Sequence, residues 1–335
     1  MPHVLLSAPD EKPWSFGWHL AVALQEIGVK TRFLDFRSIP EPNDALLEAV
    51  EQDPPAVHIV WKGERYTPET LRKVASRGVY NVLWYPDGAV PAWLPPLAEA
   101  SDLCCTQGRT ARAKLRGHGV RGVERLAEGI TPSCFEYDSI TRMDVRTYGC
   151  DVVAIGTIDR SAGYGKRLTA LNRLVSDGVR VRWWGRKMAF RRNRPWDFLT
   201  PASRAWGGKI VEGASYAKAC HCADIFLAIP RNPGNAGGLS NRAFWVTGLG
   251  TFYLSLYKKG MEEFFELGEE VAVFHNEDEM RRKVRYYLEH EEERETIARA
   301  GQQRTLRDYT NHRAFCRLFH MIAERGGPII STGAP

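Results

Sequence analysis

Short apolar runs alternate with amphipathic stretches along nearly the whole chain. The runs have the length of buried strands, and the stretches repeat their apolar residues with the period of a helix. In the first half, strands are predicted at residues 3–7, 31–36, 56–61, 80–85, 102–106 and 122–126, and helices at 14–27, 44–52 and 68–77. Such alternation predicts a parallel sheet with crossover helices on both faces.

The alternation restarts at Cys150, where an apolar strand is predicted over residues 150–156. Further strands are predicted at 179–184, 209–211, 224–229, 250–254 and 271–274, and helices at 160–177, 277–289, 291–307 and 311–325. We therefore expect an α/β protein with two doubly wound, Rossmann-like units, residues 1–147 and 148–310. The carboxyl ends of their strands should face a central cleft that takes the ligand.

Composition narrows the class of protein. The chain has 335 residues, enough for two domains, and its 44% hydrophobic and 26% charged content is that of a soluble globular protein. No apolar run has the length of a membrane span, and the first residues lack the charged start of a signal peptide. The seven cysteines show neither zinc spacing nor a disulfide framework. We therefore expect a cytoplasmic protein.

The segment before and around Arg242 has the features of a phosphate-binding loop. After the predicted strand 224–229 comes a loop that ends in Gly237, Gly238, Ser240, Asn241 and Arg242. Ser240 or Asn241 can cap a following helix, whose first turn offers free N–H groups and a positive dipole end to a phosphate. Arg242 adds a fork-shaped cation that matches phosphate oxygens in pairs. An ordinary loop with a solvated arginine explains the same residues.

Basic residues cluster at positions 180–194, with two tryptophans among them, and the net charge of the chain is +6. Such a patch could hold a nucleic-acid backbone, or the phosphates and base of a nucleotide. A solvated basic loop is the alternative. No recognisable RNA- or DNA-binding motif is present.

A series of short motifs runs through residues 216–313. They are residues 216–228, residues 240–244 with Gly248 and Gly250, residues 260–270, 286–290 and 293–301, and Tyr309, Thr310 and Arg313. In this order and density they resemble the glycosyltransferases of the CgeB-like group, which have the two-domain GT-B fold. Residues 155–157 and 184–186 fit the start of the same nucleotide-binding domain. The resemblance also implies that helix 311–325 packs back on the first unit.

The resemblance implies that Arg242 binds the diphosphate of a nucleotide sugar, with a UDP-sugar as the expected co-substrate. The loop around the diphosphate would come from Gly237, Gly238, Ser240 and Asn241, and the opposite wall from Gly156 and Thr157. Further donor contacts are expected from Arg160, Arg167, Gly185, Arg186, Glu262 and Glu263. The two glutamates could equally be stabilised by a helix dipole without any function.

Arginines and the N–H groups of a helix start can stabilise a leaving diphosphate without a metal ion. The chain contains no Asp-x-Asp run, which agrees with a site that uses neither metal nor cofactor.

One position departs from the family. After the Arg-x-Phe sequence the family usually carries a glutamate, which is expected to hold the nucleotide ribose, and this chain has Trp245. The indole could stack on a base or pack in the core, and we favour packing.

The acceptor side is expected in the first half, at Gly17, Trp18, His19, Trp84 and Asp87. His19 could act as a base toward an acceptor hydroxyl because its ordinary pKa lies near neutrality, or it could be a surface or core-edge residue. Asp87 could orient a sugar hydroxyl or accept a proton, although Pro-Asp-Gly is also a turn signature. With Arg242, these two are the predicted catalytic residues.

The predicted function is transfer of a sugar from a nucleotide-diphosphate donor to a hydroxyl-bearing acceptor. A DNA glycosyltransferase that acts on a hydroxylated base, as some phage enzymes do, is the first alternative, because of the basic stretch. A nucleotide-sugar-binding protein without turnover is the second, because of Trp245. The acceptor is accordingly a small molecule or DNA.

Overall fold

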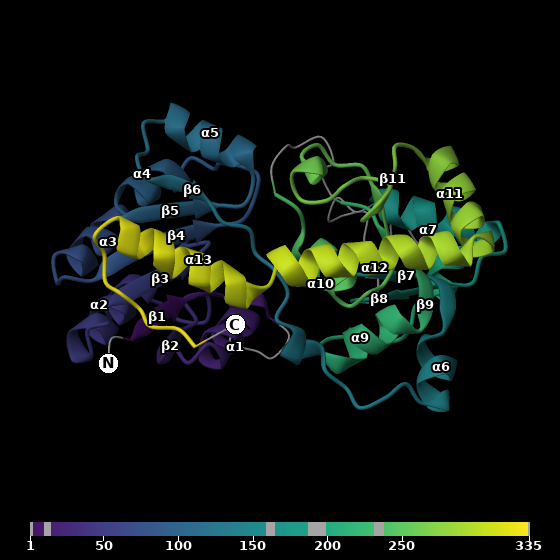
Figure 1. Ribbon diagram of the computed structural model, residues 1–335, viewed down its shortest axis with the longest axis horizontal. Helices are drawn as coiled ribbons and strands as arrows, with labels where there is room; N and C mark the ends of the chain where they lie inside the picture. The colour runs from purple at the N-terminus through teal and green to yellow at the C-terminus, as the bar shows by residue number, and fades with distance from the viewer. Residues whose placement is uncertain (1–2, 10–14, 159–164, 187–198, 231–237, 334–335) are drawn as a thin grey trace. The chain divides into compact units, whose positions relative to one another are not determined.

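The computed structural model describes residues 3–9, 15–158, 165–186, 199–230 and 238–333 (Figure 1). The chain divides into two compact units. Unit 1 comprises Met1–Cys134, Asn235–Asn241 and Asp308–Pro335, and unit 2 comprises Phe135–Gly234 and Arg242–Arg307. Each unit contains one parallel sheet flanked by helices, so the predicted α/β class with two doubly wound units is confirmed.

Unit 1 is built on a six-stranded parallel sheet with the order β2-β1-β3-β4-β5-β6. The strands are β1 (Val4–Ser7), β2 (Thr31–Leu34), β3 (Val57–Trp61), β4 (Tyr80–Tyr85), β5 (Leu103–Thr106) and β6 (Val123–Arg125). The helices are α1 (Phe16–Glu26), α2 (Pro42–Gln52), α3 (Pro68–Ala75), α4 (Leu94–Glu99), α5 (Arg109–Gly117) and α13 (Asn311–Glu324). The strand order reverses between β1 and β3, which makes their carboxyl ends the switch point of this sheet.

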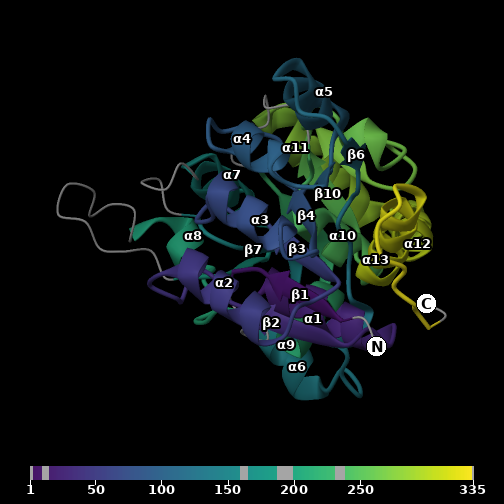
Figure 2. The same ribbon diagram turned by 90° about the vertical axis from the view of Figure 1, so that its left-hand side faces the viewer.

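Two helical layers cover the sheet of unit 1. Side chains of α2, α3, α4 and α5 form one apolar core with residues of β1, β3, β4, β5 and β6. The opposite face carries α1 and α13, which contact each other (Figure 2). The chain before α13 joins the end of the β6 segment through a parallel bridge between Ile130 and Thr310. Helix α13 therefore belongs to unit 1, although it is last in the sequence.

Unit 2 contains a five-stranded parallel sheet with the order β11-β10-β9-β7-β8. The strands are β7 (Cys150–Ile155), β8 (Val181–Trp184), β9 (Ala223–Ala228), β10 (Tyr253–Leu256) and β11 (Ala272–Phe274). The helices are α6 (Arg142–Tyr148), α7 (Gly165–Ser176), α8 (Pro201–Arg204), α9 (Ala214–His221), α10 (Asn241–Gly248), α11 (Glu277–Glu289) and α12 (Glu291–Asp308). The switch point lies between β7 and β9.

The core of unit 2 lies between its sheet and the helices α7 and α11, with further residues from α8 and α12. The side chains of Arg173 on α7 and Glu277 on α11 form an ion pair of 2.9 Å. Helices α9 and α10 are the crossovers to β9 and β10, and the right-handed rule places them on the other face.

The structure differs from the sequence prediction in several places. The helices α4, α5, α6, α8 and α9 were not predicted. Residues 209–211 form no strand, because only Trp206 bridges to Trp183 of β8 and the chain then turns at Gly208, whose φ is +92°. The boundary between the units lies at residue 134 instead of 147. Helix α6 is part of unit 2 because it packs on α9, where Lys218 pairs with Asp144 at 3.1 Å.

Candidate functional site

The loop after β7 and the start of α10 meet at the switch point of unit 2. Gly156 has a φ of +128°, a backbone conformation that residues other than glycine rarely adopt. A Cβ at this position would lie 3.1 Å from Nη2 of Arg242 and 3.4 Å from Nη1 of Arg167. Two guanidinium groups thus face the open side of one glycine. We call Gly156, Thr157, Arg167 and Arg242 the diarginine site.

Arg167 is a structural clamp within the diarginine site. Its Nε donates to the carbonyl of Ile229 at 2.7 Å, and its Nη1 donates to the carbonyl of Thr157 at 2.8 Å. These carbonyls follow β9 and β7, the two strands at the switch point. One side chain of α7 therefore fixes both loops, and the planar fork of an arginine suits that task.

Arg242 is differently placed. Among the residues that the structure describes, its half-buried guanidinium has no hydrogen-bond acceptor and no carboxylate partner. It stands in the first turn of α10, as predicted, where backbone N–H groups lack intrahelical acceptors. Burial raises the pKa of Tyr253, and the charges of Arg242 and Arg167 act in the opposite direction. An anion would complete this arrangement.

Close backbone packing supports the Gly156 loop from β8. A Cβ at Gly185 would overlap the carbonyl oxygen of Gly156, and the N–H of Gly156 donates to the carbonyl of Trp184 at 2.7 Å. Gly185 therefore belongs to the scaffold of the diarginine site, while the side chain of Arg186 is exposed. The predicted donor residues Arg160 and Gly237 lie outside the described residues, as do positions 187–194 of the basic stretch.

Trp245 packs in an aromatic cluster, as the packing interpretation expects. Its ring lies 5.2 Å from that of Phe135 and 5.7 Å from that of Tyr216, both near edge-to-face. Trp183 and Trp184 of the basic stretch are also core residues, 1% and 0% exposed, so they are not available for stacking on bases. That part of the nucleic-acid interpretation is corrected.

Glu262 and Glu263 do not start an α-helix. They lie in a single 3-10 turn, Met261–Glu263, which begins at Gly260 with a φ of +94°. Glu262 is exposed and accepts a hydrogen bond from the hydroxyl of Tyr257 at 3.3 Å. The helix-start expectation is thus wrong, because the buried Met261, Phe264 and Phe265 turn the chain instead.

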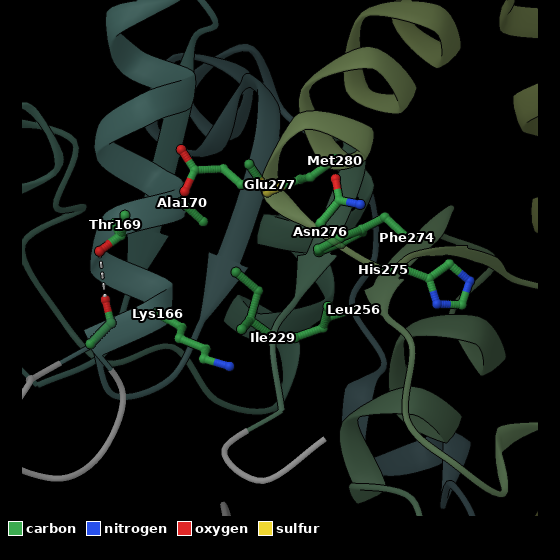
Figure 3. Close-up of a pocket in the computed structure, with 11 residues that line it drawn as sticks. Lys166, Thr169, Ala170, Ile229, Leu256, Phe274, His275, Asn276, Glu277 and Met280 are labelled. Atoms are coloured by element: carbon green, nitrogen blue, oxygen red, sulfur yellow. Dashed lines mark hydrogen bonds between the residues drawn. The ribbon is translucent and has the colours of Figure 1, made fainter. Parts of the chain in front are cut away.

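A cavity of about 590 Å³ opens beside the diarginine site at the carboxyl edge of the sheet (Figure 3). Its apolar floor is Ile229, Leu256 and Phe274, from the ends of β9, β10 and β11. The polar part of its lining comes from the starts of α7 and α11, namely Lys166, Thr169, His275, Asn276 and Glu277. Lys166 extends toward the space below α7, whereas His275 points away from that helix (Figure 3). Ile229 joins the cavity to the diarginine site, because its carbonyl holds Arg167.

Residues 238–241 are part of unit 1. Gly238 has a φ of +72°, and a Cβ there would lie 2.7 Å from the carbonyl oxygen of Pro86 and 2.8 Å from Oε1 of Gln107. A close backbone approach therefore explains this glycine. Ser240 is exposed and directly precedes α10, and Asn241 is its first residue.

Three of the predicted acceptor residues lie at the start of α1 in unit 1. Gly17 has no room for a side chain, since a Cβ would lie 2.7 Å from the carbonyl of Pro9. Trp18 is half-buried, and its backbone N–H donates to the hydroxyl of Ser15, the helix cap. His19 is 1% exposed, and burial lowers its pKa to about 4. The prediction that His19 is a base near neutral pH is corrected, because its ring is neutral there and enclosed by the core.

The two acceptor residues at the end of β4 differ from each other. Trp84 is fully buried, donates to the carbonyl of Leu126 at 3.2 Å and packs edge-on against Phe315. It is a core residue and not a ligand contact. Asp87 is exposed, and its Oδ2 lies 3.1 Å from Nζ of Lys62. Of the predicted catalytic carboxylate and histidine, only Asp87 is thus open to a substrate.

Two residues beside Asp87 were missed from the sequence. Lys62 follows β3, and Glu128 follows β6, where its side chain is fully buried. The sequence carries a weak signal for Lys62, which precedes a glycine at a strand end. For Glu128 it carries none, because burial of a carboxyl depends on the packing of distant segments.

Comparisons with known proteins agree with this geometry. Residues 166–319 match the family described as Glycosyl transferase-like. No curated protein is detectably similar in sequence. HepE from Anabaena, in a crystal structure with UDP and glucose, has a TM-score of 0.68 at 10% identity, over 97% of this chain and 100% of that one. Sucrose-phosphate synthase from Thermosynechococcus elongatus has a TM-score of 0.67 at 11% identity, over 97% of this chain and 99% of that one.

The same fold occurs with a different reaction. A Listeria monocytogenes protein described as a UDP-N-acetylglucosamine 2-epimerase has a TM-score of 0.60 at 11% identity, over 97% of this chain and 96% of that one. At such identities the solved structures establish the fold alone. Within the described residues no helix is long and apolar enough to cross a membrane. The chain has the GT-B fold, and its residues 166–319 match the Glycosyl transferase-like family.

Proposed function

We propose that the protein transfers a sugar from a nucleotide-diphosphate sugar, with UDP as the nucleotide, to a hydroxyl-bearing acceptor. The observation that carries this proposal is the guanidinium of Arg242, which faces the Gly156 loop and has no anionic partner among the described residues. The family match over residues 166–319 favours sugar transfer over epimerisation. The short motifs of residues 216–313 favour the CgeB-like group within these enzymes.

The reaction requires that the diphosphate leave the anomeric carbon with the electron pair of the broken bond. Arg242 and the first turn of α10 place positive charge where that negative charge develops, in a partly buried setting. Arg167 holds the loops around it through Thr157 and Ile229. We place the part of the donor beyond the diphosphate in the adjoining cavity, whose volume is in the range of small-molecule sites.

On the acceptor side, Asp87 is the proposed proton acceptor. It is exposed, and Lys62 keeps it paired at 3.1 Å.

We place the protein in the cytoplasm, because all seven cysteines are unbridged and a reducing compartment keeps them so.

Two measurements test the function. A ligand that binds only the folded state raises the melting temperature, so UDP and UDP-sugars should raise it in a concentration-dependent way. Incubation with a UDP-sugar and a mixture of hydroxyl acceptors should then release UDP. Stabilisation without UDP release would instead support a non-catalytic binder, and conversion of the donor to its epimer without UDP release would support an epimerase.

The DNA alternative is tested separately with a gel shift of duplex DNA at two salt concentrations. A retarded band that weakens steeply between 50 and 200 mM salt would support phosphate contacts by the basic stretch. We expect no such band, because Arg180 is already paired with Asp151 and the two tryptophans are buried.

Chelation tests the proposal that no metal ion takes part. Because arginines and helix N–H groups supply the positive charge, UDP release should change by less than about twofold when EDTA is added in excess. Activity that disappears with EDTA and returns with Mg²⁺ or Mn²⁺ would contradict this proposal and leave the donor site itself in place.

A further inference from the structure

A fully buried carboxyl lies at the carboxyl edge of the sheet in unit 1. Glu128 is 0% exposed, and its Oε1 accepts a hydrogen bond from the indole N–H of Trp61. Its Oε2 is buried and has no hydrogen-bond partner among the described residues. A buried carboxyl that is only half satisfied lowers stability and calls for an explanation.

The residue after Trp61 is held in an unusual conformation. Lys62 has a φ of +76°, and it is the one non-glycine residue with a positive φ in the described part of the chain. Such a conformation is strained for a residue that carries a Cβ. It places Nζ of Lys62 3.1 Å from Oδ2 of Asp87 and 5.0 Å from the ring centre of Trp61. Lys62 thus interacts both with Asp87 and with the indole that is hydrogen-bonded to Glu128.

The Glu128 segment is rigidly anchored. The N–H of Gly129 donates to Oδ1 of Asn311 at 3.0 Å, and the hydroxyl of Thr131 donates to the carbonyl of His19 at 2.8 Å. A Cβ at Gly129 would overlap the carbonyl of Tyr309. Contacts from α1, from the start of α13 and from the residue Tyr309 just before it therefore hold the segment that carries Glu128.

We propose that Glu128 is a positioning residue that holds a proton in unit 1 and thereby sets how firmly Lys62 binds Asp87. The inference rests on the proposed function, because Asp87 is taken as the group that receives the proton of the acceptor hydroxyl. With neutral Glu128, Asp87 is the one carboxylate paired with Lys62 among the described residues. With ionised Glu128, a second negative charge acts on the ammonium electrostatically, without an ion-pair contact, and Asp87 is freer to accept a proton.

The proton and electron balance of the step is simple. The acceptor oxygen forms a bond to the anomeric carbon while the bond from that carbon to the diphosphate oxygen breaks. The hydroxyl proton passes to Asp87, and the diphosphate leaves with the electron pair. Asp87 then returns the proton to water, to which it is exposed. Glu128 touches neither substrate and exchanges only its own proton.

Several titratable groups surround this cluster. Lys62 lowers the pKa of Glu128 and Asp87 raises it, but burial has the largest effect and raises the pKa to about 8. On β4, burial raises the pKa of Tyr85, with further contributions from Asp87 and Glu64. His19 on α1 is neutral near pH 7, because burial lowers its pKa to about 4.

The sign of the stability effect follows from this shift. Because the pKa of Glu128 is raised in the folded state, its contribution to stability is fully present below the unfolded value of 4.5 and is lost as the pH rises through about 8. Glu128→Gln keeps an acceptor for Trp61 and removes the titration. The variant should melt at nearly the wild-type temperature at pH 5 and about 5 °C or more above it at pH 9. Glu124→Gln, on β6 and paired with Arg112 and Arg325, is the control and should show no such divergence.

Two further variants test the coupling with opposite signs. Lys62→Gly suits the positive φ and removes the cation, so the pH at which stability declines should move upward. Asp87→Asn removes the neighbouring carboxylate, so that pH should move downward. A melting-temperature difference between wild type and Glu128→Gln that stays constant from pH 5 to 9 would overturn the proposal, as would shifts of the same sign in the other two variants.

Turnover separates a positioning role from a structural one. The pH dependence of kcat should show an inflection near pH 8 that Glu128→Gln lacks, with KM for the donor unchanged within about twofold. An unaltered pH profile in Glu128→Gln would overturn the positioning role. A wild-type protein that binds no UDP-sugar would contradict the proposed function and the acceptor role with it, while the melting curves would still report the proton on Glu128.

Discussion

Arg242→Ala should abolish the stabilisation by UDP and lower the rate of UDP release by about a hundredfold or more. The side chain faces Gly156 without an anionic partner among the described residues, so its removal breaks no internal ion pair. The melting temperature without ligand should therefore stay close to that of the wild type. The loss in rate corresponds to about 2.7 kcal/mol of transition-state stabilisation, the range seen when one preorganised donor is removed.

Two variants control this experiment. Arg242→Lys keeps the charge but not the fork, so it should retain a part of the stabilisation by UDP. Arg173→Ala removes an exposed arginine of unit 2 that pairs with Glu277, and it should leave the response to UDP unchanged. If Arg242→Ala responds to UDP as the wild type does, the assignment of the diphosphate to the diarginine site is wrong.

Gly185→Ala should weaken donor binding severely without touching any side chain of the site. The new Cβ would overlap the backbone of Gly156, and backbone atoms cannot move aside as the end of a flexible side chain can. The Gly156 loop must therefore shift away from β8 toward the guanidinium groups of Arg167 and Arg242. Displacements of about 1 Å in such sites cost on the order of a hundredfold in rate.

Gly208→Ala is the matched control for this variant. Gly208 has a φ of +92°, so alanine also has backbone strain there, but its neighbourhood is open, with no atom of the described residues within 4 Å of the position of a Cβ. Both variants should lose stability, measured as the free energy of unfolding in urea, and only Gly185→Ala should lose the response to UDP. Equal responses to UDP in the two variants would show that the Gly185 contact does not support the site.

The fold was largely predictable because the spacing of apolar residues and the length of the apolar runs were strong signals. Apolar runs such as β7, and helices such as α11 with its Asn276 cap, follow from local patterns. The failure at residues 209–211 has a tertiary cause. Gly207 packs against the ring of Trp184, and a single bridge at Trp206 replaces a paired strand. Local β-propensity cannot reveal that contact.

The candidate site shows the same contrast: features set by neighbouring residues in the sequence were predictable, and features set by tertiary packing were not. The position of Arg242 in the first turn of a helix followed from its neighbours in sequence, and its meeting with Gly156 was an expectation drawn from the family resemblance. Burial was not predictable residue by residue. Trp84 and His19 stand at suitable strand and helix ends, yet both lie in the core. Glu128, which no motif marks, is buried in a segment that contacts from α1 and the start of α13 hold.

The most direct test of the central claim is a crystal structure of the protein with UDP. We predict that the diphosphate oxygens lie within hydrogen-bond distance of the Arg242 guanidinium, beside Gly156. A structure with UDP bound elsewhere, and the space between Gly156 and Arg242 left empty, would contradict the account.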